Sequence, residues 1–248
     1  MKRFASIILT LAMILSLICV AGTVTTGAAS APKVSMYSSN VYFSKYGGST
    51  YEVYIQTKNT AKDAQVYAHY NYLDYMGWQD AEAEFVTTMN DGSKIWRVCF
   101  SSWNTKYCIK LVNNGKTYWD NNNGKDYDGT EKIGAATITS KRLGYQYTGW
   151  GSGFQIDAVL KNLAYHKNVF VRYTTDGWKS HHDSAMSYSM TNADGTETWT
   201  TKIDADVNGY DNGIGENFEY AICYRVNGKE YWANNFGSNY DRFFYINH

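Results

Sequence analysis

Apolar and polar residues alternate in short runs along most of this chain. Tyr51, Val53 and Ile55, for example, are separated by single residues that point to the other side of an extended backbone. Turn signals such as Asn90-Asp91-Gly92 and Asn227-Gly228 divide one run from the next. No long amphipathic helix is predicted. The pattern therefore predicts an all-β protein built from antiparallel β-sandwiches.

The same order of segments occurs twice. "VYIQTKNTAKDAQVYAHY" (53–70) aligns without a gap with "IDAVLKNLAYHKNVFVRY" (156–173), and "NGKTYWDNNNGKDYD" from Asn114 matches "NGKEYWANNFGSNYD" from Asn227. A repeat of this length is the sign of a duplicated unit. We predict two tandem immunoglobulin-like antiparallel β-sandwich domains, residues 34–130 and 137–248, joined by a short linker.

The N-terminus and the charge balance indicate where the chain acts. Lys2 and Arg3 precede an apolar run over residues 7–20 and then small residues, which predicts a secretory signal peptide at residues 1–30 and a secreted or extracellular protein. The apolar run is too short to span a bilayer, so we expect no membrane insertion. Basic and acidic residues number 23 each, without a basic run, which argues against nucleic acid as a partner.

Aromatic residues are unusually frequent, with 23 Tyr, 8 Trp and 10 Phe. Two stretches combine Tyr-Trp with an Asn-rich loop, "YWDNNNGKDY" (118–127) and "YWANNFGSNY" (231–240). Indole rings stack on the C–H face of a glucose ring, and Asn both donates to and accepts from hydroxyls. We expect Trp78 and Trp178, each after a Gly, to be exposed in turns, whereas Trp96 and Trp199 lie in predicted strands and should be core residues.

The second repeat resembles the starch-binding modules of carbohydrate-binding family 21. The resemblance rests on "VLKNLAYHKNVFVRYTTDGW" (159–178), the strand that ends near Trp199, and "FEYAICYRVNGKEYWANNFGSNY" (218–240). The first repeat is a similar but degenerate copy that keeps Gly77-Trp78 and "YWDNNNGKDY". The resemblance implies binding of starch-type α-glucans or malto-oligosaccharides. Together with the predicted signal peptide and the lack of a recognisable catalytic motif, it leads us to expect an exported, non-catalytic protein that needs no cofactor.

The resemblance also implies site residues. One α-glucan site carries over to Trp178, Trp232, Asn234 and Asn239 in the second repeat, and to Trp78, Trp119, Asn121 and Asp126 in the first. A third family aromatic aligns with Ala221 and Cys108, so both copies lack it. A second family site carries over to Asn162, Tyr165, Lys167 and Tyr188. In the first copy Lys62 and Ala64 replace the Tyr and the Lys, so no second site is expected there.

Other functions remain open at the level of sequence. A glycoside hydrolase or an accessory enzyme subunit acting on α-glucans is one alternative, although the chain has no nucleophile elbow, HExxH or phosphate loop. A structural or adhesion protein of the cell surface is another, and a cell-surface amylolytic complex is a candidate setting.

Three local patterns have simpler explanations. "RVCF" (97–100) matches the phosphatase-docking motif of family members inside animal cells, but it lies in a predicted strand. Asp204, Asp206 and Asn208 match the opening of a calcium loop, but Gly215 stands where a bidentate Glu is needed, so no metal is expected. Cys99, Cys108 and Cys223 are an odd set, which argues against a disulfide framework and favours small buried or half-buried thiols.

Overall fold

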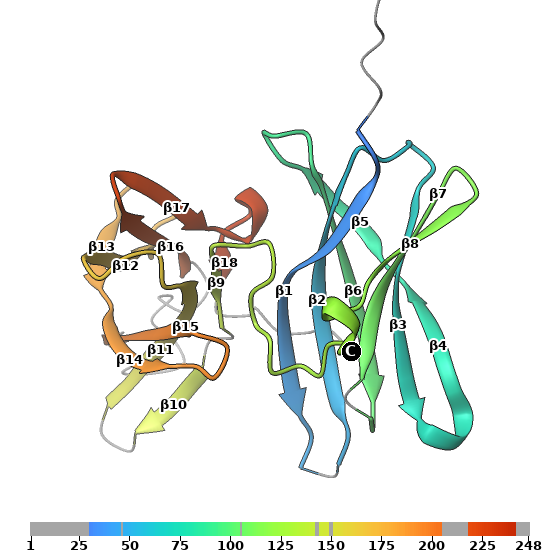
Figure 1. The fold of residues 1–248 in the computed structure, drawn as a ribbon. Coiled ribbons are helices and arrows are strands. Elements are labelled where there is room, and N and C mark those ends of the chain that lie inside the picture. Colours follow the sequence, from blue (N-terminus) through green and yellow to red (C-terminus); the bar gives the residue numbers. More distant parts are fainter. Residues whose placement is uncertain are drawn as a thin grey trace, which may run out of the picture. The chain divides into compact units, whose positions relative to one another are not determined.

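The computed structural model describes residues 30–45, 47–104, 106–141, 144–148, 151–204 and 218–241 (Figure 1). The predicted signal peptide, apart from Ser30, lies outside these residues, as do Asp206 and Asn208 of the calcium-like pattern. Within the described part of the chain, no helix has the length and apolar character needed to cross a bilayer.

The first repeat forms two antiparallel sheets, drawn in blue to green in Figure 1. One sheet has the order β1 (Lys33–Phe43), β2 (Ser49–Lys58), β6 (Lys94–Ser102), β5 (Glu84–Thr88). The other has the order β4 (Gly77–Glu82), β3 (Gln65–Leu73), β7 (Tyr107–Asn113), β8 (Lys116–Asp120). Two single 3₁₀ turns, η1 (Asp74–Met76) and η2 (Asn122–Gly124), follow β3 and β8.

The inner faces of these two sheets enclose one core. Tyr51 of β2 is fully buried and stacks on Phe100 of β6 with ring centroids 4.9 Å apart. Trp96 is buried too, and its Nε1 donates to Thr57 Oγ1 at 2.9 Å, so the prediction that it is a core residue is confirmed. The period-two pattern thus places large apolar side chains on the faces that meet.

The second repeat forms two further antiparallel sheets, drawn in yellow to red in Figure 1. One has the order β10 (Gly144–Thr148), β11 (Gly151–Lys161), β15 (Thr196–Asp204), β14 (Ser187–Thr191), with β9 (Ile138–Ser140) also on β11. The other has the order β13 (His182–Ala185), β12 (Lys167–Thr174), β16 (Glu219–Val226), β17 (Lys229–Ala233). The 3₁₀ turn η3 (Asn235–Gly237) and β18 (Tyr240–Asp241), which pairs with β16, end the described chain.

Buried tyrosines fasten the two sheets of the second repeat together. The hydroxyl of Tyr224 on β16 donates to the backbone oxygen of Lys161 at 3.0 Å, and the hydroxyl of Tyr220 lies 3.0 Å from Ser140 Oγ. Each ring fills the core while its polar end finds a partner on the opposite sheet. Trp199 packs against this core, between Ala158 of β11 and Tyr188 of β14, but it is half-buried and not fully enclosed as predicted.

The all-β, antiparallel prediction is confirmed for the described residues, which contain no α-helix. One core cluster runs from Met36 to Tyr127 and another from Ile138 to Tyr240. Each repeat thus has a core cluster of its own, and the two domains at residues 34–130 and 137–248 stay a prediction.

Two of the local patterns have a structural explanation. Val98 and Phe100 of "RVCF" point into the core, and Arg97 pairs with Glu52 at 2.6 Å, so the Arg, Val and Phe side chains of this motif are not free for a docking partner. Cys99 on β6 and Cys108 on β7 belong to different sheets and are free thiols. The prediction of buried or half-buried thiols is wrong for Cys99, which is exposed because it lies on the outer face of its strand.

Candidate functional site

The outer face of the β13-β12-β16-β17 sheet carries the candidate site of the second repeat. Because Val169 and Val171 of β12 enter the core, Phe170 and Arg172 point outward. Trp232 of β17 also faces outward, opposite Cys223 of β16, which in turn is opposite Phe170. The Trp232 ring is 37% exposed and meets Phe170 edge-on at 5.9 Å. One indole plane is therefore held rigidly on the sheet.

Trp178 lies in the loop after β12, which leaves the sheet at Thr174, four residues along β12 from Phe170 in the row of Trp232. Its backbone is left-handed, with φ 65, and its amide donates to Thr174 Oγ1 at 3.0 Å. Asp176 fixes the loop by accepting from the amide and hydroxyl of Ser180 at 3.0 and 2.7 Å. These hydrogen bonds, with a further one from Thr174, lower the pKa of Asp176 to about 2. The loop is thus ordered by its own hydrogen bonds.

Glu219 joins two of the predicted site residues. Its Oε2 accepts from Trp178 Nε1 at 2.6 Å and from Asn239 Nδ2 at 3.1 Å. Glu219 begins β16 directly opposite Thr174, where the Trp178 loop departs. The sequence analysis missed this residue, because only the pairing of β12 with β16 shows that it lies beside that loop.

The Asn-rich loop is built in the same way in both repeats. Asn234 Oδ1 accepts from Gly237 N at 3.2 Å, and Asn121 Oδ1 accepts from Gly124 N at 3.1 Å. The closing residues, Asn239 and Asp126, are left-handed, with φ 59 and 58, and each amide donates back to the loop's first carbonyl at 2.9 Å. Asn and Asp tolerate this backbone better than other side chains. Part of the Asn pattern therefore shapes the loop itself.

The residues predicted for a second site are only partly on the surface. Tyr165 is 91% exposed and Tyr188 of β14 is 52% exposed. The side chain of Lys167 is only 4% exposed, and its Nζ donates to Glu197 Oε2 and Asn162 Oδ1, both at 2.7 Å. Lys167 thus holds Asn162 to the strands, and the two tyrosines are the accessible members of this group.

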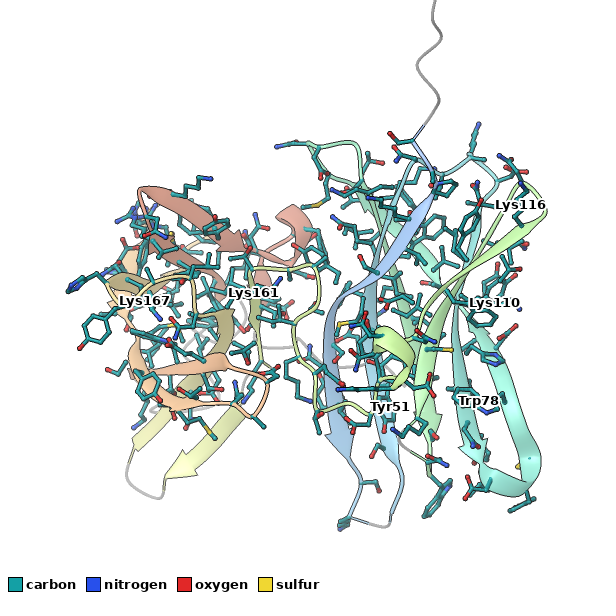
Figure 2. All side chains as sticks on the ribbon, in the orientation of Figure 1. Tyr51, Trp78, Lys110, Lys116, Lys161 and Lys167 are labelled. Atoms are coloured by element: carbon teal, nitrogen blue, oxygen red, sulfur yellow. The ribbon has the colours of Figure 1, made fainter. Side chains whose placement is uncertain are left out.

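The first repeat carries its aromatic residues on the outer face of the β4-β3-β7-β8 sheet (Figure 2 labels Trp78 and Lys110). Trp78 and Trp119 are 42% and 49% exposed. His69 of β3 stacks on Trp78 at 5.0 Å and touches Trp119 edge-on at 5.2 Å. His69 was not predicted, and it links two tryptophans that were.

Trp78 lies in β4 and not in a turn as predicted. The chain turns earlier, in η1 and at Gly77, whose φ is 71, and Trp78 then pairs with Asn71. The expected exposure of Trp78 is confirmed, but its placement in a turn is wrong, because the glycine ends the turn and the residue after it is already in a strand.

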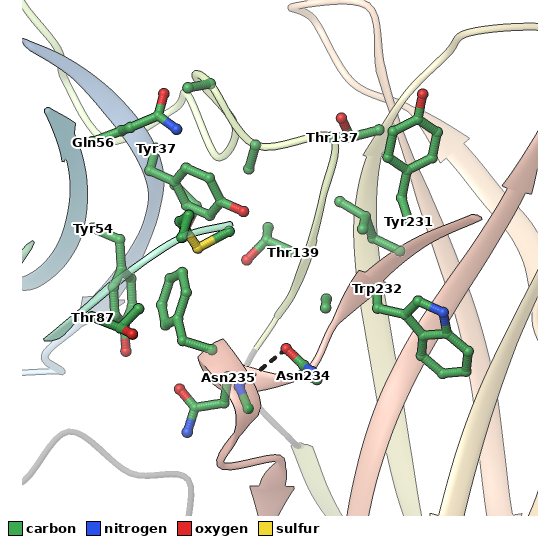
Figure 3. A pocket seen from close by; sticks show the side chains of 18 of the residues that line it. Tyr37, Tyr54, Gln56, Thr87, Thr137, Thr139, Tyr231, Trp232, Asn234 and Asn235 are labelled. Atoms are coloured by element: carbon green, nitrogen blue, oxygen red, sulfur yellow. Dashed lines mark hydrogen bonds between the residues drawn. The ribbon is translucent and has the colours of Figure 1, made fainter. Parts of the chain in front are cut away.

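A pocket of about 800 Å³ lies beside the second-repeat face (Figure 3). Its lining includes Trp232 and Asn234 of the predicted site. The other residues labelled in Figure 3 are Tyr37, Tyr54, Gln56, Thr87, Thr137, Thr139, Tyr231 and Asn235. The lining combines hydroxyls, amides and aromatic rings with the carboxylates of Asp91 and Glu230, a mixture of polar and aromatic groups that suits a polyhydroxyl ligand.

Metal-binding chemistry has no counterpart among the residues that the structure describes. They contain no group of three or more His, Cys, Asp or Glu side chains placed to hold an ion. Asp204 ends β15, and the rest of the calcium-like pattern lies outside the described ranges.

We expect Glu219→Ala to weaken glucan binding about fivefold to tenfold, since the loss of its two charge-assisted hydrogen bonds frees the Trp178 ring and the Asn239 amide. Titration with a malto-oligosaccharide measures the affinity. Glu219→Gln keeps an acceptor oxygen, so its affinity should lie between that of Glu219→Ala and that of the original chain. Equal affinity of all three chains would show that Glu219 does not position the site.

Fold and site together describe a β-sandwich module with two partly exposed tryptophans, Trp232 on the outer face of one sheet and Trp178 in a loop next to it. The family model "Carbohydrate/starch-binding module (family 21)" matches residues 157–242. The resemblance predicted for the second repeat is thereby confirmed. The match does not extend to the first repeat, for which the same kind of module stays a prediction.

Curated relatives match about a third of the chain. Glycogen-binding subunit 76A of Drosophila melanogaster is 33% identical over 81 residues, which are 33% of this chain and 12% of that protein. Protein phosphatase 1 regulatory subunit 3B of Bos taurus is 37% identical over 85 residues, which are 33% of this chain and 28% of that protein. The chain thus spans less than a third of the length of either relative.

Two solved structures are also similar. The carbohydrate-binding module of the muscle glycogen-targeting subunit of protein phosphatase 1 is 23% identical, with a TM-score of 0.36, over 42% of this chain and 73% of that one. The starch-binding domain of Rhizopus oryzae glucoamylase, solved with β-cyclodextrin and maltoheptaose, is 29% identical, with a TM-score of 0.31, over 42% of this chain and 91% of that one.

Proposed function

We propose that this chain is an exported, non-catalytic protein that binds starch-type α-glucans through the outer sheet faces of its two repeats. The observation that carries the proposal is the second-repeat face, where Trp178 and Trp232 are held, partly exposed, around the small side chains of Ala221 and Cys223. Indoles stack on sugar rings, and the amides of the Asn loop suit hydroxyls.

The relatives support the choice of ligand. The name of the Drosophila melanogaster relative describes a glycogen-binding subunit, and glycogen is an α-glucan like starch. Export is proposed from the N-terminal sequence alone. We do not propose a phosphatase partner, because the side chains of Val98 and Phe100 in the "RVCF" strand are in the core.

Two copies suggest bivalent binding. Each face has two indoles and few other contacts, so each alone should bind weakly. A linker of about eight residues spans at most roughly 28 Å, which would keep the second face near a chain held by the first. Binding by the second face then becomes intramolecular, and the avidity for long glucans can exceed that of either repeat by on the order of 10²-fold.

Retention on an insoluble polysaccharide tests the proposal. We expect the purified chain to be retained on granular starch and to pass through cellulose and xylan, and to release no reducing sugar from soluble starch. Retention on cellulose but not starch would contradict the ligand class. Sugar release would favour the glycoside hydrolase alternative. A chain with Trp78→Ala and Trp119→Ala should lose its avidity for granules but keep its affinity for a short oligosaccharide.

A further inference from the structure

The place of the third family aromatic is occupied by a small side chain in both repeats, Cys108 on β7 and Ala221 on β16. Both lie on the outer faces that carry the tryptophans, because their neighbours in sequence enter the cores. The residue directly opposite Cys108 in register is His69, and the residue directly opposite Ala221 is Arg172. In each repeat, therefore, a planar nitrogen-containing group lies across from the missing ring.

A carboxylate fixes each planar group from the next strand. Asp80 lies opposite His69 and Asp183 lies opposite Arg172, so the same three-strand row occurs twice. His69 Nδ1 is 2.6 Å from Asp80 Oδ1, while Lys110 donates to the other carboxylate oxygen at 2.6 Å. In the second repeat, the one guanidinium fills both oxygens of Asp183, at 2.7 and 2.8 Å.

Each planar group also lies against a tryptophan of the candidate site. His69 stacks on Trp78 with an interplanar angle of 15°, and the guanidinium carbon of Arg172 is 5.6 Å from the centre of the Trp232 ring. The side chains of His69 and Arg172 remain 28% and 31% exposed. They are thus held in place from the side and still open toward a ligand.

We propose that Arg172, and His69 in the first repeat, supply the third contact surface of the glucan site in place of the lost aromatic, with Asp183 and Asp80 as positioning residues. A guanidinium is flat and stacks as an aromatic ring does. The guanidinium of Arg172 has five N–H groups. Two of them donate to Asp183, which leaves three that can donate to glucose hydroxyls. The small residue opposite leaves the space in which the sugar meets this group. The inference rests on the proposed function.

The test uses the full chain with Trp78→Ala and Trp119→Ala, so that only the second repeat binds. Binding of this parent to maltoheptaose tests the proposed function separately. Compared with this parent chain, the chain that also carries Arg172→Ala should bind maltoheptaose about tenfold more weakly, which is the scale of one charge-assisted hydrogen bond. Arg172→Lys, which keeps the charge but not the plane, should be nearly as weak. Lys229→Ala, which removes a charge from the end of β17, is the matched control and should bind like the parent.

A restoration experiment separates replacement of the aromatic from a general effect of charge. Adding Ala221→Tyr to Arg172→Ala should recover most of the lost affinity, because a ring then returns to the opposite strand. If Arg172→Ala binds within about twofold of the parent, the inference is wrong. It is also wrong if Arg172→Lys binds as the parent does, or if a folded Ala221→Tyr, Arg172→Ala chain recovers nothing. Thermal melting of every variant checks the fold. If Ala221→Tyr lowers the melting temperature, the restoration experiment is set aside and the affinity of Arg172→Lys decides whether the inference holds.

Discussion

Replacing Trp178 and Trp232 together by alanine is expected to weaken binding to a short malto-oligosaccharide by roughly two to three orders of magnitude. A central aromatic of a binding site contributes roughly 2 kcal/mol or more, and 1.4 kcal/mol corresponds to about a factor of ten. The two rings are 36% and 37% exposed, so they can offer one face to a sugar while the other rests on the protein. Titration of the full chain with Trp78→Ala and Trp119→Ala isolates this effect.

Trp103 offers the matched control. It is 57% exposed at the end of β6, with its ring against Gly47, and it belongs to neither candidate face. Trp103→Ala should leave the affinity unchanged. The melting temperature of the Trp178, Trp232 double variant should stay close to that of the parent. A double variant that unfolds would identify the two rings as core residues, and one that binds normally would remove the second-repeat face from the proposed site.

Glu197→Ala is expected to lower the free energy of unfolding by roughly 3–5 kcal/mol, the largest effect on stability that we predict from an ion pair here. The side chain of Lys167 is 4% exposed, and the substitution leaves its ammonium buried without a countercharge. Trp199 Nε1 loses its acceptor as well, at 2.8 Å from Glu197 Oε2. Urea unfolding of the full chain measures the change.

Arg225→Ala is the comparison for this prediction. Arg225 pairs with Glu230 at a similar distance, 2.7 Å, but the two side chains are 49% and 47% exposed. Exposed pairs contribute little, so the loss should stay within about 1 kcal/mol. Equal losses for Glu197→Ala and Arg225→Ala would show that the burial of Lys167 does not make its ion pair different from an exposed one.

The sequence determined the fold class and the location of the aromatic faces. Alternation of the kind seen at Tyr51, Val53 and Ile55 places every second side chain inward, and this needs only the geometry of a strand. The same rule accounts for the outward position of Trp232, since its neighbours Tyr231 and Ala233 pack toward the core, although the family resemblance was what marked it as a site residue. Duplication strengthened both inferences, because each pattern could be read twice.

The tertiary structure alone decided which groups surround those tryptophans. Glu219 is 41 residues from Trp178 in sequence but accepts its indole N–H, and Arg172 lies across from Ala221 only because β12 pairs with β16 in one register. A one-residue change of register would turn each of these side chains to the other face. The sequence also did not show that Lys167 is buried in an ion pair, because its partner Glu197 lies on the opposite sheet. Local pattern fixes the face on which a side chain lies, whereas its partners come from strand pairing and from the packing of one sheet on another, which link residues far apart along the chain.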